Sequence, residues 1–303
     1  MQAECAPIAL FVYKRLEHLS LVINGLLANP EAKRSDLIIF SDAARSGSDK
    51  PKVDQVRDYI SKIQGFSSVK IYKSRSNLGL SKSIIRGVTK VLEDYERIIV
   101  LEDDTVPSPD FLAYANEGLR LYALDDRVIS IHGYNYPVKE KMPDAFFLRG
   151  ADCWGWATWR RGWALFNPDG DELMRTLVKL GVKKEFDFGD TYMFSEMLQA
   201  QVDGRNDSWA IRWYASAFLE NKLTLYPGES LIQNIGNDCS GEHCVSDKTW
   251  DTALAPFSPK NLNCLKVRES QYAKSTIARY FASVQFSRKQ RFFNLIKRYI
   301  RLG

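Results

Sequence analysis

Long hydrophobic runs, histidine and cysteine are all scarce in this chain of 303 residues. No stretch approaches the roughly 20 apolar residues of a membrane-spanning helix, and the N-terminus lacks the pattern of a signal peptide. The five cysteines are odd in number and scattered, so we expect reduced thiols in a cytosolic compartment. With 45% apolar and 26% charged residues, the composition is that of a soluble globular protein.

Aspartate and glutamate are absent from the last 33 residues, where eight lysines and arginines account for the net charge of +5. Phe292, Leu295, Ile296 and Tyr299 recur at helical spacing between these basic residues. A basic amphipathic helix of this kind lies in the interface of an anionic membrane. We expect the tail to hold the protein at the inner face of the plasma membrane and not to bind nucleic acid. The alternative is a terminal helix packed on the body.

The first 132 residues alternate between short apolar runs and helical patterns. The strand starts are about 30 residues apart, the length of a strand–helix–strand unit, which predicts a parallel sheet with helices on both faces. Strands are expected at 8–13, 37–40, 69–72, 98–101 and 128–132. Helices are expected at 19–27, 53–63, 80–92 and 112–124.

The second half of the chain is less regular. Strands are expected at 145–148 and 223–226, and helices at 171–180, 190–201 and 211–219. Residues 150–168 are expected to form a loop or a loop and helix, and 234–248 a polar turn-rich segment. The expected organisation is a nucleotide-sugar-binding half at 1–132, an acceptor-side half of the same domain at 133–250, and a C-terminal extension at 251–303.

Three acidic residues, Glu102, Asp103 and Asp104, follow the buried strand predicted at 98–101. Three adjacent carboxylates repel one another and need a cation or strong hydrogen-bond donors. Ligands of α/β sheets bind at the carboxyl ends of the strands, and Mg²⁺ or Mn²⁺ takes one or two carboxylates plus substrate phosphates. The triplet therefore predicts a site for a metal ion and a diphosphate. The alternative is an acidic turn, with Asp104 or Ser108 as the N-cap of the next helix.

Six motifs support the first interpretation through their order. They are PIALFVYKR, IIFSDA, SRSNLGL, LEDD, RGADCWGWATWRRGW and YPGESLIQNIGND. With them the chain resembles the GT-A glycosyltransferases from about Pro7 to Cys244. It looks closest to family 2-like bacterial sugar transferases and is more distantly similar to N-acetylglucosaminyltransferase I. The resemblance implies a Rossmann-like, mostly parallel sheet with helices on both faces, a helical acceptor-side region and a basic C-terminal helix.

The resemblance also implies roles for the strand-end residues. Asp104 would bind Mn²⁺ or Mg²⁺, Asp103 would face the ribose and Glu102 the donor sugar. Arg15 would contact the nucleotide, and Asp42 would accept a hydrogen bond from the uracil N–H. The alternatives are a solvated loop charge for Arg15 and a turn acid for Asp42.

Two loop segments would complete the donor site. Asn77 and Gly79 would lie beside the nucleotide, although a plain turn before a helix competes with this interpretation. Asp152 would hold a hydroxyl of the donor sugar, and Gly155 would let the backbone come close to the donor.

Four tryptophans occur between residues 150 and 163. Their spacings of two, three and four residues mean that they cannot all face one core. Aromatic faces beside polar groups bind sugar rings, so we assign Trp154 and Trp156 to the donor site. Trp159 and Trp163 are assigned to packing.

An inverting transfer needs a carboxylate base that takes the proton of the acceptor hydroxyl. In N-acetylglucosaminyltransferase I, which this chain distantly resembles, the base precedes a tryptophan. The similar stretch here is NDSWAIRWY, which nominates Asp207. One acid stands where two are expected, so Asp190 and Glu196 remain alternatives.

His243 lies where many GT-A enzymes have a histidine that helps to bind the metal or the diphosphate. A stray loop histidine is the alternative. A zinc site with Cys239 and Cys244 is disfavoured, because no second ligand pair has suitable spacing.

The expected function is therefore metal-dependent, inverting transfer of a sugar from a nucleotide diphosphate sugar, with UDP as the expected nucleotide. The acceptor would be a glycan or a lipid-linked molecule in cell-surface polysaccharide assembly. A nucleotide-sugar pyrophosphorylase is the first alternative, but its glycine-rich phosphate loop is missing from VYKRLEHL. A membrane-associated protein with a degenerate core is the second, and the intact LEDD argues against it.

Overall fold

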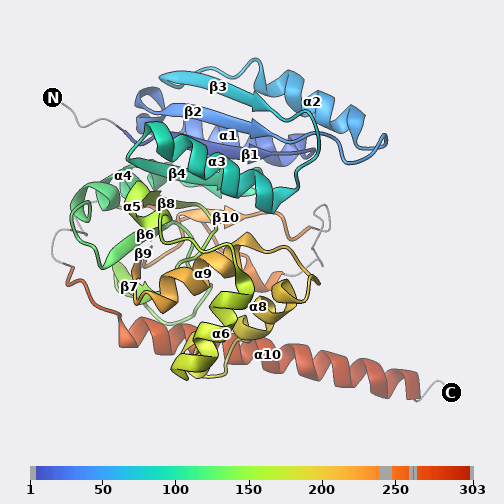
Figure 1. The fold of residues 1–303 in the computed structure, drawn as a ribbon, viewed down its shortest axis with the longest axis vertical. Helices are drawn as coiled ribbons and strands as arrows, with labels where there is room; N and C mark the ends of the chain where they lie inside the picture. The colour runs from blue at the N-terminus through green and yellow to red at the C-terminus, as the bar shows by residue number, and fades with distance from the viewer. Residues whose placement is uncertain (1–4, 239–247, 259–261, 263–264, 301–303) are drawn as a thin grey trace.

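A single eight-stranded sheet forms the centre of the molecule (Figure 1). The computed structural model describes residues 5–238, 248–258, 262 and 265–300, with side chains up to residue 285. The strands are β1 (Ile8–Val12), β2 (Asp36–Ser41), β3 (Ser68–Lys73), β4 (Arg97–Glu102), β6 (Val128–His132), β7 (Ala145–Arg149), β8 (Trp156–Trp159) and β9 (Leu223–Pro227). Two short strands, β5 (Thr105–Pro107) and β10 (Ile232–Asn234), form a separate antiparallel pair.

The strand order is β3-β2-β1-β4-β8-β6-β9-β7. The first four strands are parallel, and so are β6 and β9, whereas β8 and β7 run antiparallel to their neighbours. The predicted mostly parallel sheet is confirmed. The antiparallel β8 lies in the segment where a loop or a loop and helix was expected, because its buried WATW sequence is only four residues long and lies between residues rich in glycine and arginine.

Helices cover both faces of the sheet, as predicted (Figure 1). They are α1 (Leu16–Leu27), α2 (Lys50–Ile60), α3 (Leu80–Asp94), α4 (Phe111–Leu121), α5 (Arg160–Trp163), α6 (Gly170–Leu180), α7 (Lys183–Phe186), α8 (Phe194–Val202), α9 (Trp209–Leu219) and α10 (Gln271–Ile300), with 3₁₀ turns η1 (Pro30–Arg34) and η2 (Lys248–Trp250). The helix expected at 190–201 begins only at Phe194, because Gly189 and Asp190 have φ of 73° and 65°.

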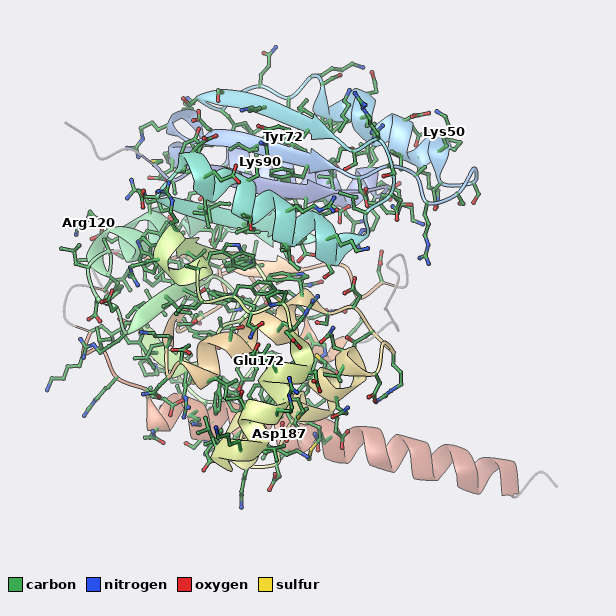
Figure 2. All side chains as sticks on the ribbon, in the orientation of Figure 1. Lys50, Tyr72, Lys90, Arg120, Glu172 and Asp187 are labelled. Atoms are coloured by element: carbon green, nitrogen blue, oxygen red, sulfur yellow. The ribbon has the colours of Figure 1, made fainter. Side chains whose placement is uncertain are left out.

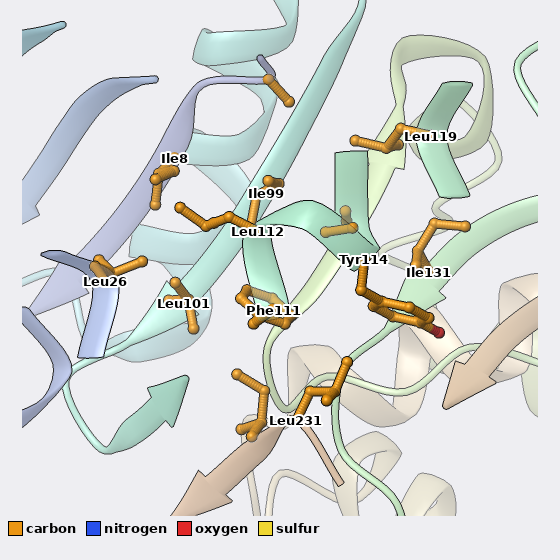
Figure 3. Packing of buried hydrophobic residues seen from close by; sticks show 14 of the residues in the cluster. Ile8, Leu26, Ile99, Leu101, Phe111, Leu112, Tyr114, Leu119, Ile131 and Leu231 are labelled. Carbon is orange, nitrogen blue, oxygen red and sulfur yellow. The ribbon is translucent and has the colours of Figure 1, made fainter. Parts of the chain in front are cut away.

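The central strand β1 is buried on both faces. Ile8 and Leu10 pack into one core with α1, α2 and α4, whereas Ala9 and Phe11 pack into a second core with α3 and α9. Figure 3 shows the first core, where Leu112 of α4 lies beside Ile99 of β4. Burial on both faces explains why the strand reads as a continuous apolar run. Exposed charged residues such as Lys50, Arg120 and Glu172 lie around these layers (Figure 2).

The C-terminal helix α10 belongs partly to the body of the protein. Ala273, Ile277 and Phe281 are buried in a third core with β7, α6, α8 and α9. The helix then continues past the body toward the C-terminus (Figure 1). Its first half therefore matches the alternative of a packed terminal helix, while the aromatic and basic side chains predicted to meet a membrane lie beyond the described side chains. Within the described chain, no helix is both long enough and apolar enough to span a bilayer.

Candidate nucleotide and metal site

The sheet changes direction between β1 and β4. From β1 the chain proceeds outward to β2 and β3, and β4 then returns to the other side of β1. Ligands of open α/β sheets bind outside the carboxyl ends of the strands at such a switch point. Arg15 follows β1, and Glu102, Asp103 and Asp104 lie at the end of β4, so the predicted residues meet there.

Arg15 binds both aspartates that follow β4. Its Nη2 donates to Asp103 Oδ1 and, at 2.7 Å, to Asp104 Oδ2, and its Nε lies 3.1 Å from Asp103 Oδ1. The backbone N–H of Tyr13 donates to the other oxygen of Asp103 at 3.3 Å. The guanidinium therefore holds the two carboxylates together, and Arg15 is not the solvated loop charge of the alternative interpretation.

Asp103 and Asp104 place two carboxyl groups against the single guanidinium of Arg15, and Glu102 adds a third carboxyl group beside them. Burial, and then the charges of Asp104 and Asp103, raise the pKa of Glu102 to about 8, against the opposing charge of Arg15. Burial also raises the pKa of Asp103, again opposed by Arg15. Three carboxyl groups beside one guanidinium form a site that is complementary to a further cation, because a bound cation would also favour the ionised form of Glu102.

The strand pair β5–β10 closes the site from the C-terminal half of the chain. The N–H of Ile235 donates to the carbonyl of Asp104 at 2.9 Å. A Cβ on the next residue, Gly236, would collide with the Asp104 carboxylate, so only glycine leaves room there. Asp238 Oδ2 lies 3.1 Å from Nε2 of His18 in α1. The NIGND motif is thus folded onto the acidic cluster.

The donor set fits a divalent cation that a phosphate ligand completes. Oδ1 of Asp104 has no hydrogen-bond partner within the part of the chain that the structure describes, and Gly236 leaves space beside this carboxylate. No group of three or more His, Cys, Asp or Glu residues is arranged for a metal in that same part. One or two carboxylates are what Mg²⁺ uses when substrate phosphates supply the rest of its shell.

Asp42, just after β2, holds the loop before α3, whereas it was predicted to accept a hydrogen bond from a nucleotide base. Its carboxylate accepts hydrogen bonds from the backbone N–H groups of Leu78 and Gly79, both at 2.9 Å, and from Nδ2 of Asn77 at 3.1 Å. It also accepts from the N–H of Ala43. Because its oxygens are already paired, we revise the prediction that Asp42 accepts from a base. Asn77 and Gly79 form the loop that it holds before α3.

Asp152 and Trp154 lie on the other side of β4 from Arg15. Trp156 pairs with Val100, so the residues before it continue past the end of β4 toward the acidic cluster. Asp152 is 25% exposed and accepts from the hydroxyl of Tyr136 at 2.7 Å. Trp154 is partly buried, with its ring edge-on to Tyr134 at 4.7 Å.

Trp156 departs from its prediction as a sugar-binding residue. Its side chain is 1% exposed and lies in the second core, between Trp163, Trp209 and Trp213. Trp154 precedes β8, whereas Trp156 is its first residue, and the side chains of a strand point into the layers that pack on either face of the sheet. Trp159 is 5% exposed, and both it and Trp163 pack in the cores as predicted.

Asp207 lies just before α9, at the same edge of the sheet. Its side chain is 67% exposed, and Oδ1 lies 3.2 Å from Nη2 of Arg212. The same nitrogen donates to Ser81 Oγ at 2.7 Å, in the first turn of α3. Asp190 pairs instead with Lys184 at 3.9 Å, and Glu196 is exposed on α8.

Sequence reasoning overlooked two residues of this region. His18 lies three residues after Arg15, and this helical spacing would have placed it on the same side of α1. Arg212 is 7% exposed and has no comparable sequence signal. His243, Cys239 and Cys244 lie outside the described residues, so the metal-ligand and zinc interpretations of that segment stay untested.

No protein-family model matches the sequence, and no curated protein matches it either. Among solved structures, S. aureus TarS 1–349 in complex with UDP-GlcNAc aligns at a TM-score of 0.35 and 13% identity, over 53% of this chain and 46% of that chain. The mannosyltransferase PcManGT from Pyrobaculum calidifontis, in complex with GDP-Man and Mn²⁺, aligns at 0.31 and 14% identity, over 45% and 39%.

A 4-diphosphocytidyl-2C-methyl-D-erythritol synthase from Anaerococcus prevotii aligns at 0.34 and 10% identity, over 53% of this chain and 73% of that chain. The chain thus spans less than half of the TarS fragment and of the mannosyltransferase. TM-scores this low do not distinguish between the reactions of these proteins. Only the geometry of the site can distinguish between them.

Proposed function

We propose that this chain is a GT-A-type glycosyltransferase that uses a nucleotide diphosphate sugar and a divalent cation. The observation that carries the proposal is the pairing of Arg15 with Asp103 and Asp104 at the switch point between β1 and β4. This is where an α/β sheet presents its ligand site. The excess of carboxylates over positive charge favours a cation bound there together with a diphosphate.

In this proposal the bound cation neutralises the negative charge that develops on the leaving diphosphate. Asp104 is its main protein ligand, and Asp103 lies toward the ribose. Arg15 pairs with the two aspartates, and its side chain is long enough to turn toward a phosphate, which it binds as readily as a carboxylate. Asn77 and Gly79, held by Asp42, present polar backbone next to the nucleotide.

Asp207 is the proposed base of an inverting transfer. It is largely exposed, so an acceptor can reach it, and Arg212 fixes it relative to the start of α3. Within the part of the chain that the structure describes, neither Asp190 nor Glu196 has a hydrogen bond or ion pair that links it to α3. UDP is the proposed nucleotide, and a glycan or lipid-linked molecule of a cell-surface polysaccharide the proposed acceptor.

Product analysis tests this function and separates it from the pyrophosphorylase alternative. The protein is incubated with UDP-glucose, UDP-N-acetylglucosamine or GDP-mannose, with and without Mn²⁺, and released nucleoside diphosphate is measured. We expect slow Mn²⁺-dependent release by hydrolysis, since no acceptor is present. Pyrophosphate-dependent formation of nucleoside triphosphate from the same donors would instead identify a pyrophosphorylase, and inactivity together with no nucleotide binding would contradict both.

We also propose that the end of α10 binds an anionic membrane surface. Six of the eight basic residues of the tail follow Gln285, and each contributes about 1 kcal/mol of attraction near such a surface. Because Ala273, Ile277 and Phe281 belong to the third core, a truncation has to keep them. A chain ending at Gln285 should keep its melting temperature but lose low-salt binding to phosphatidylserine vesicles, with phosphatidylcholine vesicles as control. Equal binding by the full-length and shortened chains would contradict this.

A further inference from the structure

A buried histidine beside the proposed site has no evident structural purpose. His132 ends β6 and is fully buried, and neither of its ring nitrogens has a hydrogen-bond partner among the residues that the structure describes. Burial lowers its pKa, so the ring is neutral and carries one N–H donor and one acceptor nitrogen. Unpaired polar atoms in a core reduce stability, and a phenylalanine would avoid that cost.

The ring of His132 lies against a carboxylate. Its Nε2 is 3.6 Å from Asp152 Oδ2, which is too long for a hydrogen bond but close enough to become one after a small movement. Tyr226 packs against the imidazole at 4.9 Å between ring centroids. The unpaired nitrogen therefore faces a group that is itself partly exposed.

Asp152 already has two donors that fix its orientation. Tyr136 donates its hydroxyl to Oδ2 at 2.7 Å, and the N–H of Cys153 donates to Oδ1 at 2.8 Å. With His132 as a third neighbour, the carboxylate is supported from the end of β6 and from its own loop. Its exposed fraction of 25% leaves it free to accept a hydrogen bond from a ligand.

The position of Asp152 relative to the acidic cluster follows from the sheet. Trp156 pairs with both Val100 of β4 and His132 of β6, so the loop before Trp156 lies at the ends of both strands. Gly155 is packed so closely on Ile232 of β10 that a Cβ would collide with it, and β10 pairs with β5, which follows Asp104. Asp152 therefore lies beside β4 on the side opposite Arg15, at the same strand ends as the acidic cluster.

We propose that His132 and Tyr136 are positioning residues that hold Asp152 as the carboxylate that recognises a ring hydroxyl of the transferred sugar. This inference rests on the proposed function and adds the sugar-recognising group to it. When a hydroxyl donates to Asp152, a small shift of the carboxylate brings it within hydrogen-bond range of His132 Nε2. The site then favours a sugar with a free hydroxyl at this position, because a deoxy sugar leaves the supported carboxylate unpaired.

The test compares the affinity for a nucleotide sugar with that for its nucleoside diphosphate, by calorimetry in the presence of Mn²⁺. The probes are UDP, UDP-glucose, UDP-N-acetylglucosamine, GDP and GDP-mannose. The dissociation constant of the nucleoside diphosphate, divided by that of the nucleotide sugar, measures the contribution of the sugar to binding. In His132→Phe this ratio should fall about tenfold, a typical cost of losing one hydrogen bond to a charged group, while affinity for the nucleoside diphosphate stays within about twofold.

Three further variants separate positioning from packing. His132→Gln keeps a donor near Nε2 and should restore most of the sugar contribution. Tyr136→Phe should reduce the contribution of the sugar to binding as His132→Phe does. Tyr114→Phe also removes a buried hydroxyl, which donates to the carbonyl of Leu225, but it should leave that contribution unchanged. The melting temperature of His132→Phe should not fall, because an unpaired polar ring is replaced by an apolar one.

The outcomes are distinguishable. If the wild-type protein binds none of the five probes, the proposed function fails. If it binds nucleotide sugars more tightly than nucleoside diphosphates and the ratio is unchanged in His132→Phe and Tyr136→Phe, only the positioning role is wrong. Should His132→Phe not fold, Tyr136→Phe alone decides, since its ring packing against Phe281 is retained.

Discussion

Two carboxylate groups lie at the same edge of the sheet and differ in what neutralises them. Asp42, after β2, accepts hydrogen bonds from two backbone N–H groups of a loop and from one side-chain amide. Asp103 and Asp104, after β4, are paired with the long side chain of Arg15. The backbone donors around Asp42 cannot leave without unfolding the loop, whereas a guanidinium can move to another anion.

The difference shows how to tell a structural acid from a ligand-binding one when both follow a buried strand. An acid bound by fixed donors stabilises its surroundings, and an acid bound by a mobile cation is available for exchange. Replacing each acid should therefore affect stability in the first case and ligand binding in the second.

The largest effect is expected for Asp104→Asn. Loss of this ligand should reduce transfer to background, by on the order of ten-thousandfold, because several kcal/mol of charge stabilisation is lost. The melting temperature should change little, since Arg15 keeps its contacts with Asp103. Mn²⁺-dependent turnover of a nucleotide sugar measures the effect. Asp203→Asn, which breaks an exposed pair with Arg205, is the matched control and should be fully active.

Asp207→Asn extends the comparison to an acid that is exposed and paired with one arginine. If it is the base, kcat should fall about a hundredfold to ten-thousandfold with nucleotide-sugar affinity nearly unchanged, because the base acts on the acceptor. Steady-state kinetics with an identified acceptor and calorimetry with the donor separate the two quantities. If kcat stays near the wild-type value in Asp207→Asn but falls strongly in Asp190→Asn or Glu196→Gln, the base is Asp190 or Glu196 and not Asp207.

The smallest effect on chemistry is expected for Asp42→Asn. An amide N–H₂ would face the N–H groups of Leu78 and Gly79, so the loop should loosen and the protein should lose about 1–3 kcal/mol of stability. Nucleotide affinity should fall only a few-fold. Urea unfolding and calorimetry provide the two numbers. A variant with unchanged stability and abolished nucleotide binding would mean that Asp42 contacts the base after all.

The sheet, and the position of the acidic residues at the end of one of its strands, could be predicted from the sequence because both depend on short-range patterns. The alternation over residues 6–132 predicts parallel strands, and the acids after Leu101 lie at a strand end in any parallel arrangement. Asp103 and Asp104 were identified in this way, whereas Arg15 was nominated by its place in the resemblance.

The remaining contacts depend on distant parts of the chain. Nothing local indicates that Trp156 enters a tryptophan core, since three of its ring neighbours come from α5 and α9. The loop after β3 donates its hydrogen bonds to the Asp42 carboxylate only once β2 and β3 are paired in the sheet. His132 looks like any strand residue until β8 brings Asp152 next to it.

The central claim is that the carboxylates after β4 bind a cation together with a nucleoside diphosphate in exchange for Arg15. Electron paramagnetic resonance of free Mn²⁺ tests it directly, because the signal is lost on binding. UDP or GDP should tighten Mn²⁺ binding to the wild-type protein by about tenfold or more, and Asp104→Asn should abolish this coupling. Arg15→Gln should bind Mn²⁺ alone more tightly than the wild type. Mn²⁺ binding that neither nucleotide strengthens, and that Asp104→Asn leaves unchanged, would contradict the account.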